Sequence, residues 1–215
     1  MRALRIFAVT AALVGVSTGM ALAADPVTTI PDGVVPATPI DRGDCPNPIA
    51  HHDGTDDTPG SGSTLGGPSA PFWYLGVAHT PSGPVQIDAV QFFSEFWVTA
   101  GNVTVHVYEL DNPSNAADAT IFISAGGNYE VTFSEPVCVD SAYGVVFCPD
   151  PGVWGVLGED TSAPDGTSYQ NNTDQGGCQL ISPIGMDLLI TSCVSECGPT
   201  PTVNATWGTL KANYR

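Results

Sequence analysis

Two short acidic stretches of the sequence carry the residue types that bind hard cations. Their candidate ligands are Asp53, Asp56 and Asp57 in the first stretch, and Glu159, Asp160 and Asp165 in the second. Ca²⁺ takes roughly six to eight oxygen ligands, and Gly-rich acidic loops supply both carboxylate and backbone carbonyl oxygens. Neither stretch has the spacing of an EF-hand loop. We therefore expect Ca²⁺ as the cofactor, with plain surface acidity as the alternative.

Nitrogen and sulfur ligands are less convincing as a metal site. His51 and His52 are adjacent, and neighbouring residues of a strand point to opposite faces, so both imidazoles rarely reach one ion. Cys193 and Cys197 have a zinc-like spacing, but no second close pair completes a site. We expect a solvated acidic loop at the histidines.

Two tryptophans are candidates for ligand contact. Trp73 and Trp154 each lie next to Pro or Gly turn residues, and a flat aromatic face can stack on the C–H face of a sugar ring. The alternative is a place in the core, because every second residue of a strand points inward. We predict that both indoles bind ligand.

No pattern in the chain predicts catalysis. The Gly-Ser-Gly-Ser run at 60–63 has no strand–turn–helix context around its serines, and the sequence has neither a phosphate-binding Gly loop nor a His-Glu-x-x-His zinc motif. With 22 acidic residues, chance carboxylate pairs are common. We expect no enzymatic activity, with a glycoside-active enzyme built on two facing carboxylates as the alternative.

The charge balance excludes several classes of partner. The chain has 22 Asp and Glu against 5 Lys and Arg, a formal net charge of −17, and no base lies between Arg42 and Lys211. Nucleic-acid binding needs Lys and Arg to replace counterions. We therefore predict no nucleic-acid partner.

The first 23 residues have the parts of a signal peptide. Arg2 and Arg5 form a basic start, an apolar run follows, and Ala21-Leu22-Ala23 is a small-residue cleavage site. No other segment approaches the roughly 20 apolar residues of a membrane-spanning helix. The chain is thus expected to be secreted or at the cell surface, without a transmembrane anchor.

Six cysteines follow this leader: Cys45, Cys138, Cys148, Cys178, Cys193 and Cys197. An even number in an exported chain predicts disulfides, and six cysteines allow 15 pairings. Local bridges between Cys193 and Cys197 and between Cys138 and Cys148 are plausible, which would leave Cys45 for Cys178.

The rest of the chain divides into three parts. Residues 24–44 are Pro-rich and predicted to be a linker, residues 45–198 a β-domain, and residues 199–215 a tail. After a Gly- and Ser-rich loop at 53–69, short apolar runs alternate with turn residues in the manner of an all-β fold.

The strands that position the candidate residues follow from this alternation. The clearest are Asn102–Leu110, with Val103, Val105 and Val107 on one face, and the segment around Tyr129–Phe133. Others are expected near 72–79, 85–98, 119–124, 143–148, 153–157, 178–182 and 186–193. We predict a two-sheet antiparallel sandwich, jelly-roll-like and disulfide-bonded.

The tail has an aromatic and apolar stripe at helical spacing, formed by Trp207, Leu210, Lys211 and Tyr214 before the final Arg215. We expect a short helix there.

Short motifs from about residue 50 to 194 carry a resemblance to a protein group. They are His52-Asp53-Gly54, Ile87–Phe92, Val103–Val107, Tyr143–Val146, Asp160–Pro164 and Ser168-Tyr169. Their order resembles bacterial exported β-sandwich domains of the galactose-binding-like, jelly-roll type. The ending from Thr206 to Arg215 resembles a T-W-G-x-I/V-K-x-x-Y-R tag of secreted bacterial proteins, which implies sorting or surface attachment through Trp207, Lys211, Tyr214 and Arg215.

These expectations combine into one functional hypothesis. We expect an exported, non-catalytic module that binds a carbohydrate or surface polymer and is stabilised by Ca²⁺. Its partner would be a glycan or a cell-surface component. The alternative is a structural subunit of the cell surface, an extracellular matrix or a filament, held by its tail.

Overall fold

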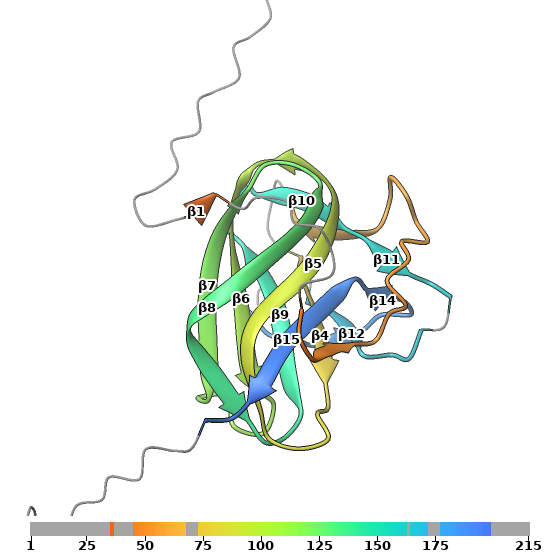
Figure 1. The fold of residues 1–215 in the computed structure, drawn as a ribbon. Helices are drawn as coiled ribbons and strands as arrows, with labels where there is room; N and C mark the ends of the chain where they lie inside the picture. Colours follow the sequence, from red (N-terminus) through yellow and green to blue (C-terminus); the bar gives the residue numbers. More distant parts are fainter. Residues whose placement is uncertain (1–34, 37–44, 68–72, 163, 172–176, 199–215) are drawn as a thin grey trace, which may run out of the picture.

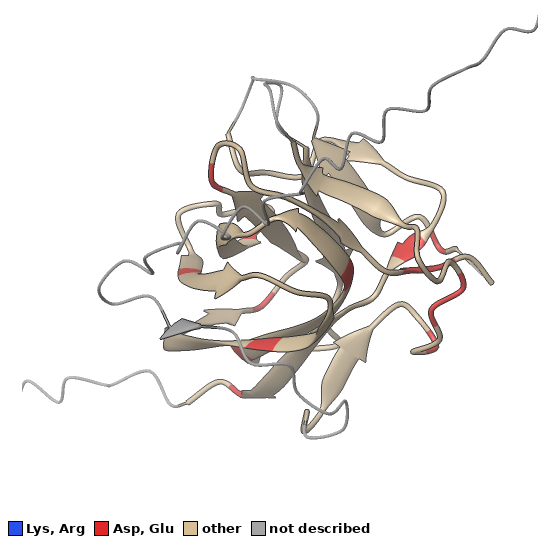
Figure 2. Ribbon diagram, turned by 90° about the horizontal axis from the view of Figure 1, so that it is seen from above, with Lys and Arg blue, Asp and Glu red and all other residues tan. Residues whose placement is uncertain are grey.

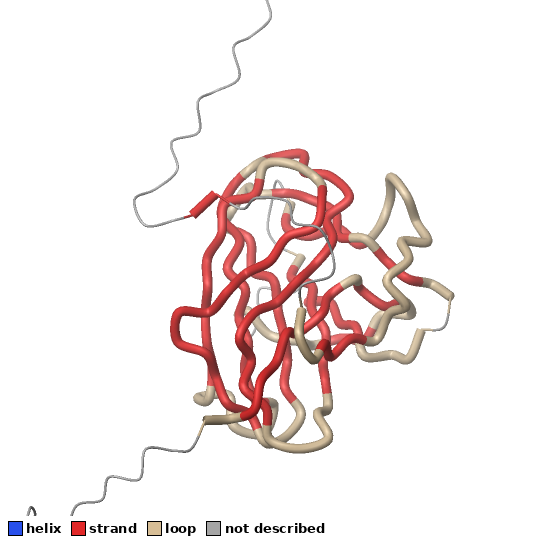
Figure 3. The backbone as a smooth tube through the Cα atoms, in the orientation of Figure 1, coloured by secondary structure: helices blue, strands red, loops and turns tan. Residues whose placement is uncertain are grey.

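The computed structural model describes residues 35–36, 45–67, 73–162, 164–171 and 177–198. The predicted leader, most of the predicted linker and the whole tail with Trp207, Lys211, Tyr214 and Arg215 lie outside these residues. The regular elements of the described part are all strands (Figure 3), which confirms the all-β prediction. Within that part no helix is long and apolar enough to span a membrane.

The first layer is a seven-stranded sheet (Figure 1). Its order is β1 (Val35–Pro36), β7 (Ala116–Ile123), β6 (Gly101–Glu109), β9 (Tyr143–Pro149), β4 (Tyr74–His79), β12 (Ser168–Asn171) and β13 (Ser182–Pro183). The pairings are antiparallel except for β1 with β7, which is parallel.

The second layer is built around the long strand β5. The order is β2 (Pro48–Ala50), β15 (Ile190–Glu196), β5 (Val85–Thr99), β10 (Trp154–Leu157) and β3 (Ser63–Gly66), and β8 (Gly127–Val139) also pairs with β5. Strand β15 pairs with the first half of β5 and β10 with the second half. A separate two-stranded sheet joins β11 (Glu159–Asp160) to β14 (Asp187–Leu188).

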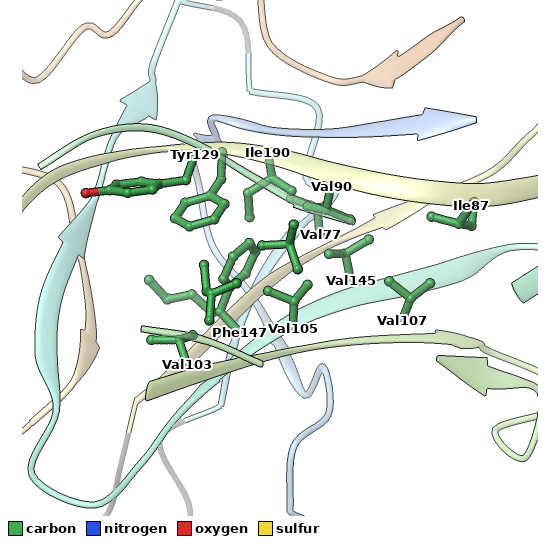
Figure 4. Close-up of a cluster of buried hydrophobic side chains, with 14 of the residues drawn as sticks. Val77, Ile87, Val90, Val103, Val105, Val107, Tyr129, Val145, Phe147 and Ile190 are labelled. Carbon is green, nitrogen blue, oxygen red and sulfur yellow. The ribbon is translucent and has the colours of Figure 1, made fainter. Parts of the chain in front are cut away.

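The core lies between the two large sheets, as the alternation predicted. Val103, Val105 and Val107 of β6 are 0% exposed, and Tyr129 and Val131 of β8 are 1% exposed. In Figure 4 the β6 valines face side chains of β5, β8 and β15 across the interior. Burying one such side chain contributes roughly 1.5–3 kcal/mol, so this contact surface is what holds the sandwich together.

Three disulfides are present, but none is one of the pairs considered plausible from sequence. The bridges are Cys45–Cys193, Cys138–Cys197 and Cys148–Cys178. Strand register explains two of them. Pro48 of β2 pairs with Cys193 of β15, which brings Cys45 close, and β8 and β15 both border β5 at the end where Cys138 and Cys197 meet. Three disulfides indicate an oxidising compartment.

Two local predictions were wrong. The expected strand at 178–182 is mostly irregular, with only Ser182–Pro183 paired, and the expected loop at 53–69 contains the edge strand β3. The strand β3 is short and ends at Gly66 with a φ of 75°, so it lacks the length and alternation that mark a strand in sequence.

Candidate functional site

A loop between β2 and β3, residues 51–62, is fastened along the outside of the second sheet; we call it the cover loop. Three of its backbone amides donate long-range hydrogen bonds to other residues that the structure describes. Asp53 N donates to Asp160 Oδ2 at 2.8 Å, Asp57 N to the Glu159 carbonyl at 2.9 Å, and Gly60 N to Glu95 Oε2 at 2.9 Å. The cover loop is therefore bound to β11 and β5.

These bonds bring the two predicted calcium stretches together. Asp160 accepts from Asp53 N and from the amide and hydroxyl of Ser162, and these bonds lower its pKa to about 2. Asp57 Oδ2 accepts from the amide of Thr161 at 2.9 Å. The acidic segments lie close together at one side of the molecule in Figure 2, where the described residues include no Lys or Arg.

The carboxylates of this region serve as hydrogen-bond acceptors for the chain itself. Asp53 and Asp56 each accept from an amide two residues ahead, at 2.7 and 3.2 Å. Glu159 is 5% exposed, and burial raises its pKa. In the described part of the chain no three His, Cys, Asp or Glu side chains form a group that could hold a metal ion. Calcium binding stays a prediction of the sequence.

A shallow pocket opens between the cover loop and the second sheet. It has a volume of about 210 Å³ and is lined by Gly54, Asp56, Phe93, Asn128 and Leu189. The side chain of Glu95 lies beside Asp56, and burial and this neighbouring carboxyl group raise the pKa of Glu95. The pocket thus combines an aromatic side chain with oxygen acceptors, a composition typical of small ligand sites.

The two predicted tryptophans meet around the edge strand β3. Gly66 pairs with Trp154 of β10, and its amide donates to the carbonyl of Trp73 at 2.7 Å. The backbones of Trp73 and Trp154 therefore flank the same glycine. Trp73 is 39% exposed, and Trp154 is half-buried with no partner for its indole N–H among the described residues.

A third aromatic side chain, which sequence reasoning missed, joins this edge. Gly155 lies under the ring of Trp97, which packs against the core, so its neighbour Trp154 points to the outer face. Val156 shares that face and pairs with Phe96, which is 39% exposed. We call Trp73, Phe96 and Trp154 the aromatic edge.

Phe96 could not be placed from its sequence pattern. Ser94, two residues earlier, is fully buried and pairs with the core residue Leu157. A bulge between these pairs turns Phe96 to the outer face. No residue type in the stretch predicts that bulge.

A buried histidine cluster lies on the other side of the cover loop. His79 of β4 is 0% exposed, and its ring stacks on His51 with centroids 4.9 Å apart. His51 Nδ1 contacts Asp165 Oδ2 at 2.5 Å. The carboxylate of Asp165 is therefore paired with an imidazole, and its amide lies 3.4 Å from both oxygens of Asp187, the residue that pairs with Asp160.

The chain matches no protein-family model and no curated protein. The functional argument therefore rests on the geometry of these side chains.

Proposed function

We propose that this chain is an exported, non-catalytic module that binds a carbohydrate or another surface polymer through the aromatic edge. The observation that carries the proposal is the 39% exposure of both Trp73, whose carbonyl accepts from Gly66 of β3, and Phe96 of β5, with Trp154 on the strand β10 between β3 and β5. Large aromatics are costly to leave in water and are enriched where a partner covers them.

The polar side chains of the nearby pocket limit the class of ligand that fits. The pocket beside the cover loop offers Asp56 and Asn128 as oxygen acceptors, which suit a ligand rich in hydroxyl or ammonium donors. The described residues contain no Lys or Arg to hold phosphate or sulfate. A neutral or amino-sugar polymer fits better than an anionic one.

The three disulfides support a role outside the cytosol, and the signal-peptide pattern of residues 1–23 supports export. Phe96 and Trp154 lie on the outer side of the second sheet, and the pocket opens between that sheet and the cover loop. A polymer chain would therefore stack on the aromatic edge while its donors reach the pocket.

Binding to immobilised polysaccharides tests this proposal. Affinity electrophoresis in gels containing neutral, amino-sugar or uronic-acid polymers, with and without Ca²⁺, should retard the full chain in at least one neutral or amino-sugar gel. The Trp73→Ala and Phe96→Ala variants should each bind roughly tenfold more weakly, since truncating an aromatic anchor costs more than about 1 kcal/mol.

Leu110 provides a matched control, because it is 40% exposed but lies outside the aromatic edge. The Leu110→Ala variant should bind like the wild type. The proposal fails if no polymer retards the wild type under either condition, or if all three variants bind equally well.

A further inference from the structure

The side chain of His79 is enclosed without a hydrogen bond. It is 0% exposed, and neither ring nitrogen has a partner among the described residues. Its ring lies between two others: His51 at 4.9 Å with an interplanar angle of 10°, and Tyr143 at 5.4 Å with an angle of 50°. Only a neutral imidazole suits such a place, because a buried charge needs a partner.

The two rings that cover His79 differ in how firmly they are held. Tyr143 belongs to β9 and pairs directly with His79 across the first sheet. His51 belongs to the cover loop and is held by Asp165, whose own amide lies 3.4 Å from both Asp187 oxygens. The cover loop is therefore the part that can move away from His79 while the sheet stays intact.

The charged and titratable groups that face His79 disfavour its protonation on balance. His51 and His52 approach from the cover loop, Asp165 from the segment before β12, and Tyr143 from β9. Burial is the largest influence, the two histidines add to it, and Asp165 alone opposes it. Together they lower the pKa of His79 from 6.5 to about 3.

We propose that the cover loop is a latch released by acid. It opens when His79 takes up a proton, because the imidazole can hold that proton only when the loop no longer covers it. The opening lifts Gly54 and Asp56, and with them one wall of the pocket. This inference does not depend on which ligand the protein binds.

The size of the effect follows from linkage. The pKa of His79 is lowered in the closed form, so its contribution to closure is fully present above the exposed value of 6.5 and decreases progressively as the pH falls from 6.5 towards 3. The ratio of open to closed loop should rise about tenfold between pH 7.5 and 5.5, and about 90-fold by pH 4.5.

Two carboxyl groups of the same region act in the opposite direction. The pKa values of Glu95 and Glu159 are raised by burial, so their protonation favours the closed form as the pH falls. Any test must therefore change His79 alone and leave these groups in place.

Amide hydrogen exchange tests the latch in the full chain. The exchange rates are measured by NMR and corrected for the intrinsic pH dependence of exchange. The reporters are Asp53, Asp57 and Gly60, whose amides fasten the cover loop. Their protection should fall about tenfold from pH 7.5 to 5.5, whereas amides of β6 should keep theirs. Equal loss of protection in β6 would show global unfolding and overturn the proposal.

The His79→Phe variant keeps a ring in the stack and loses no hydrogen bond, so its cover-loop amides should show no such fall. His106→Phe is the matched control, because His106 pairs with Asp118 on the outer side of β6, and it should behave like the wild type. If His79→Phe does not fold, the imidazole titration of wild-type His79 decides: no protonation coupled to loop opening above pH 4.5 overturns the latch.

Discussion

Replacing Glu109 with Gln should destabilise the fold although the two side chains have the same shape. Glu109, at the end of β6, is 5% exposed, and one carboxylate oxygen accepts from Asp140 N at 3.0 Å and from the amide and hydroxyl of Ser141 at 3.2 Å each. The other oxygen accepts from Asn115 Nδ2 at 3.1 Å. One ionised side chain thus holds the turn between β8 and β9 and the loop after β6.

The expected cost follows from these four bonds. A hydrogen bond to a charged group contributes about 1.5–3 kcal/mol against about 0.5–1.5 for a neutral one. In the Gln variant, three of the bonds weaken by about 1 kcal/mol each. The fourth is lost, because the new Gln NH₂ group faces the NH₂ group of Asn115, and the sum is about 4 kcal/mol. Relief of the repulsion with the Asp140 carboxylate offsets part of this sum, so we expect about 2–3 kcal/mol.

Urea unfolding of the oxidised protein at pH 7 measures the difference, and the unfolding temperature should fall by about 5–10 °C. Glu130→Gln is the control, because Glu130 accepts one side-chain bond, from Gln91 at 2.8 Å. It should cost less than about 1 kcal/mol. An equal cost for both variants would refute the reasoning.

The pH dependence provides a second criterion. The bonds from Asp140 N, the Asn115 side chain and the Ser141 hydroxyl lower the pKa of Glu109 from 4.5 to about 2. A lowered carboxyl pKa stabilises the fold fully above the unfolded value and loses that effect as the pH falls through the folded value. The wild type and Glu109→Gln should therefore converge in stability between pH 4.5 and 2, and a constant gap over this range would refute the assignment.

Two further variants test the packing and the cross-links. Gly76→Ala places a Cβ against a backbone carbonyl of β9, so it should lower the free energy of unfolding by about 1–3 kcal/mol. In the control Gly83→Ala, the new Cβ meets no atom within 4 Å, and the effect should be near neutral. Similar values for both variants would contradict the close approach of β4 to β9. Replacing Cys45 and Cys193 together by Ser opens a loop of 148 residues. The gain in entropy of the unfolded chain should lower the free energy of unfolding by up to about 5 kcal/mol. An unchanged urea midpoint would show that this bridge does not constrain the unfolded chain.

Strand alternation accounts for the part of the fold that sequence predicts well. Strands β6 and β8 bury every second residue over long stretches, because one face of each lies against the core and the other does not. Strand β9 is buried along nearly its whole length, so its apolar run shows burial without showing which way each side chain points.

The candidate sites depend on contacts that alternation does not encode. Two of the disulfide pairs follow from strand order, which places Cys45 beside Cys193 although 148 residues separate them. The meeting of Asp53 with Asp160 across 107 residues is equally remote in the chain. His79 occupies an ordinary strand position. The sequence around it does not predict that the ring of His51 stacks on the His79 ring in the folded chain.

The central place of β5 has a consequence for how the chain acquires its structure during synthesis. This strand is bordered by β8, β10 and β15, and β15 is the last strand of the described residues. The second sheet therefore stays incomplete until nearly the whole domain has emerged, and its partly built stages expose strand edges that invite association with other chains. The excess of negative charge opposes such encounters, because partly folded copies repel one another before their edges can pair.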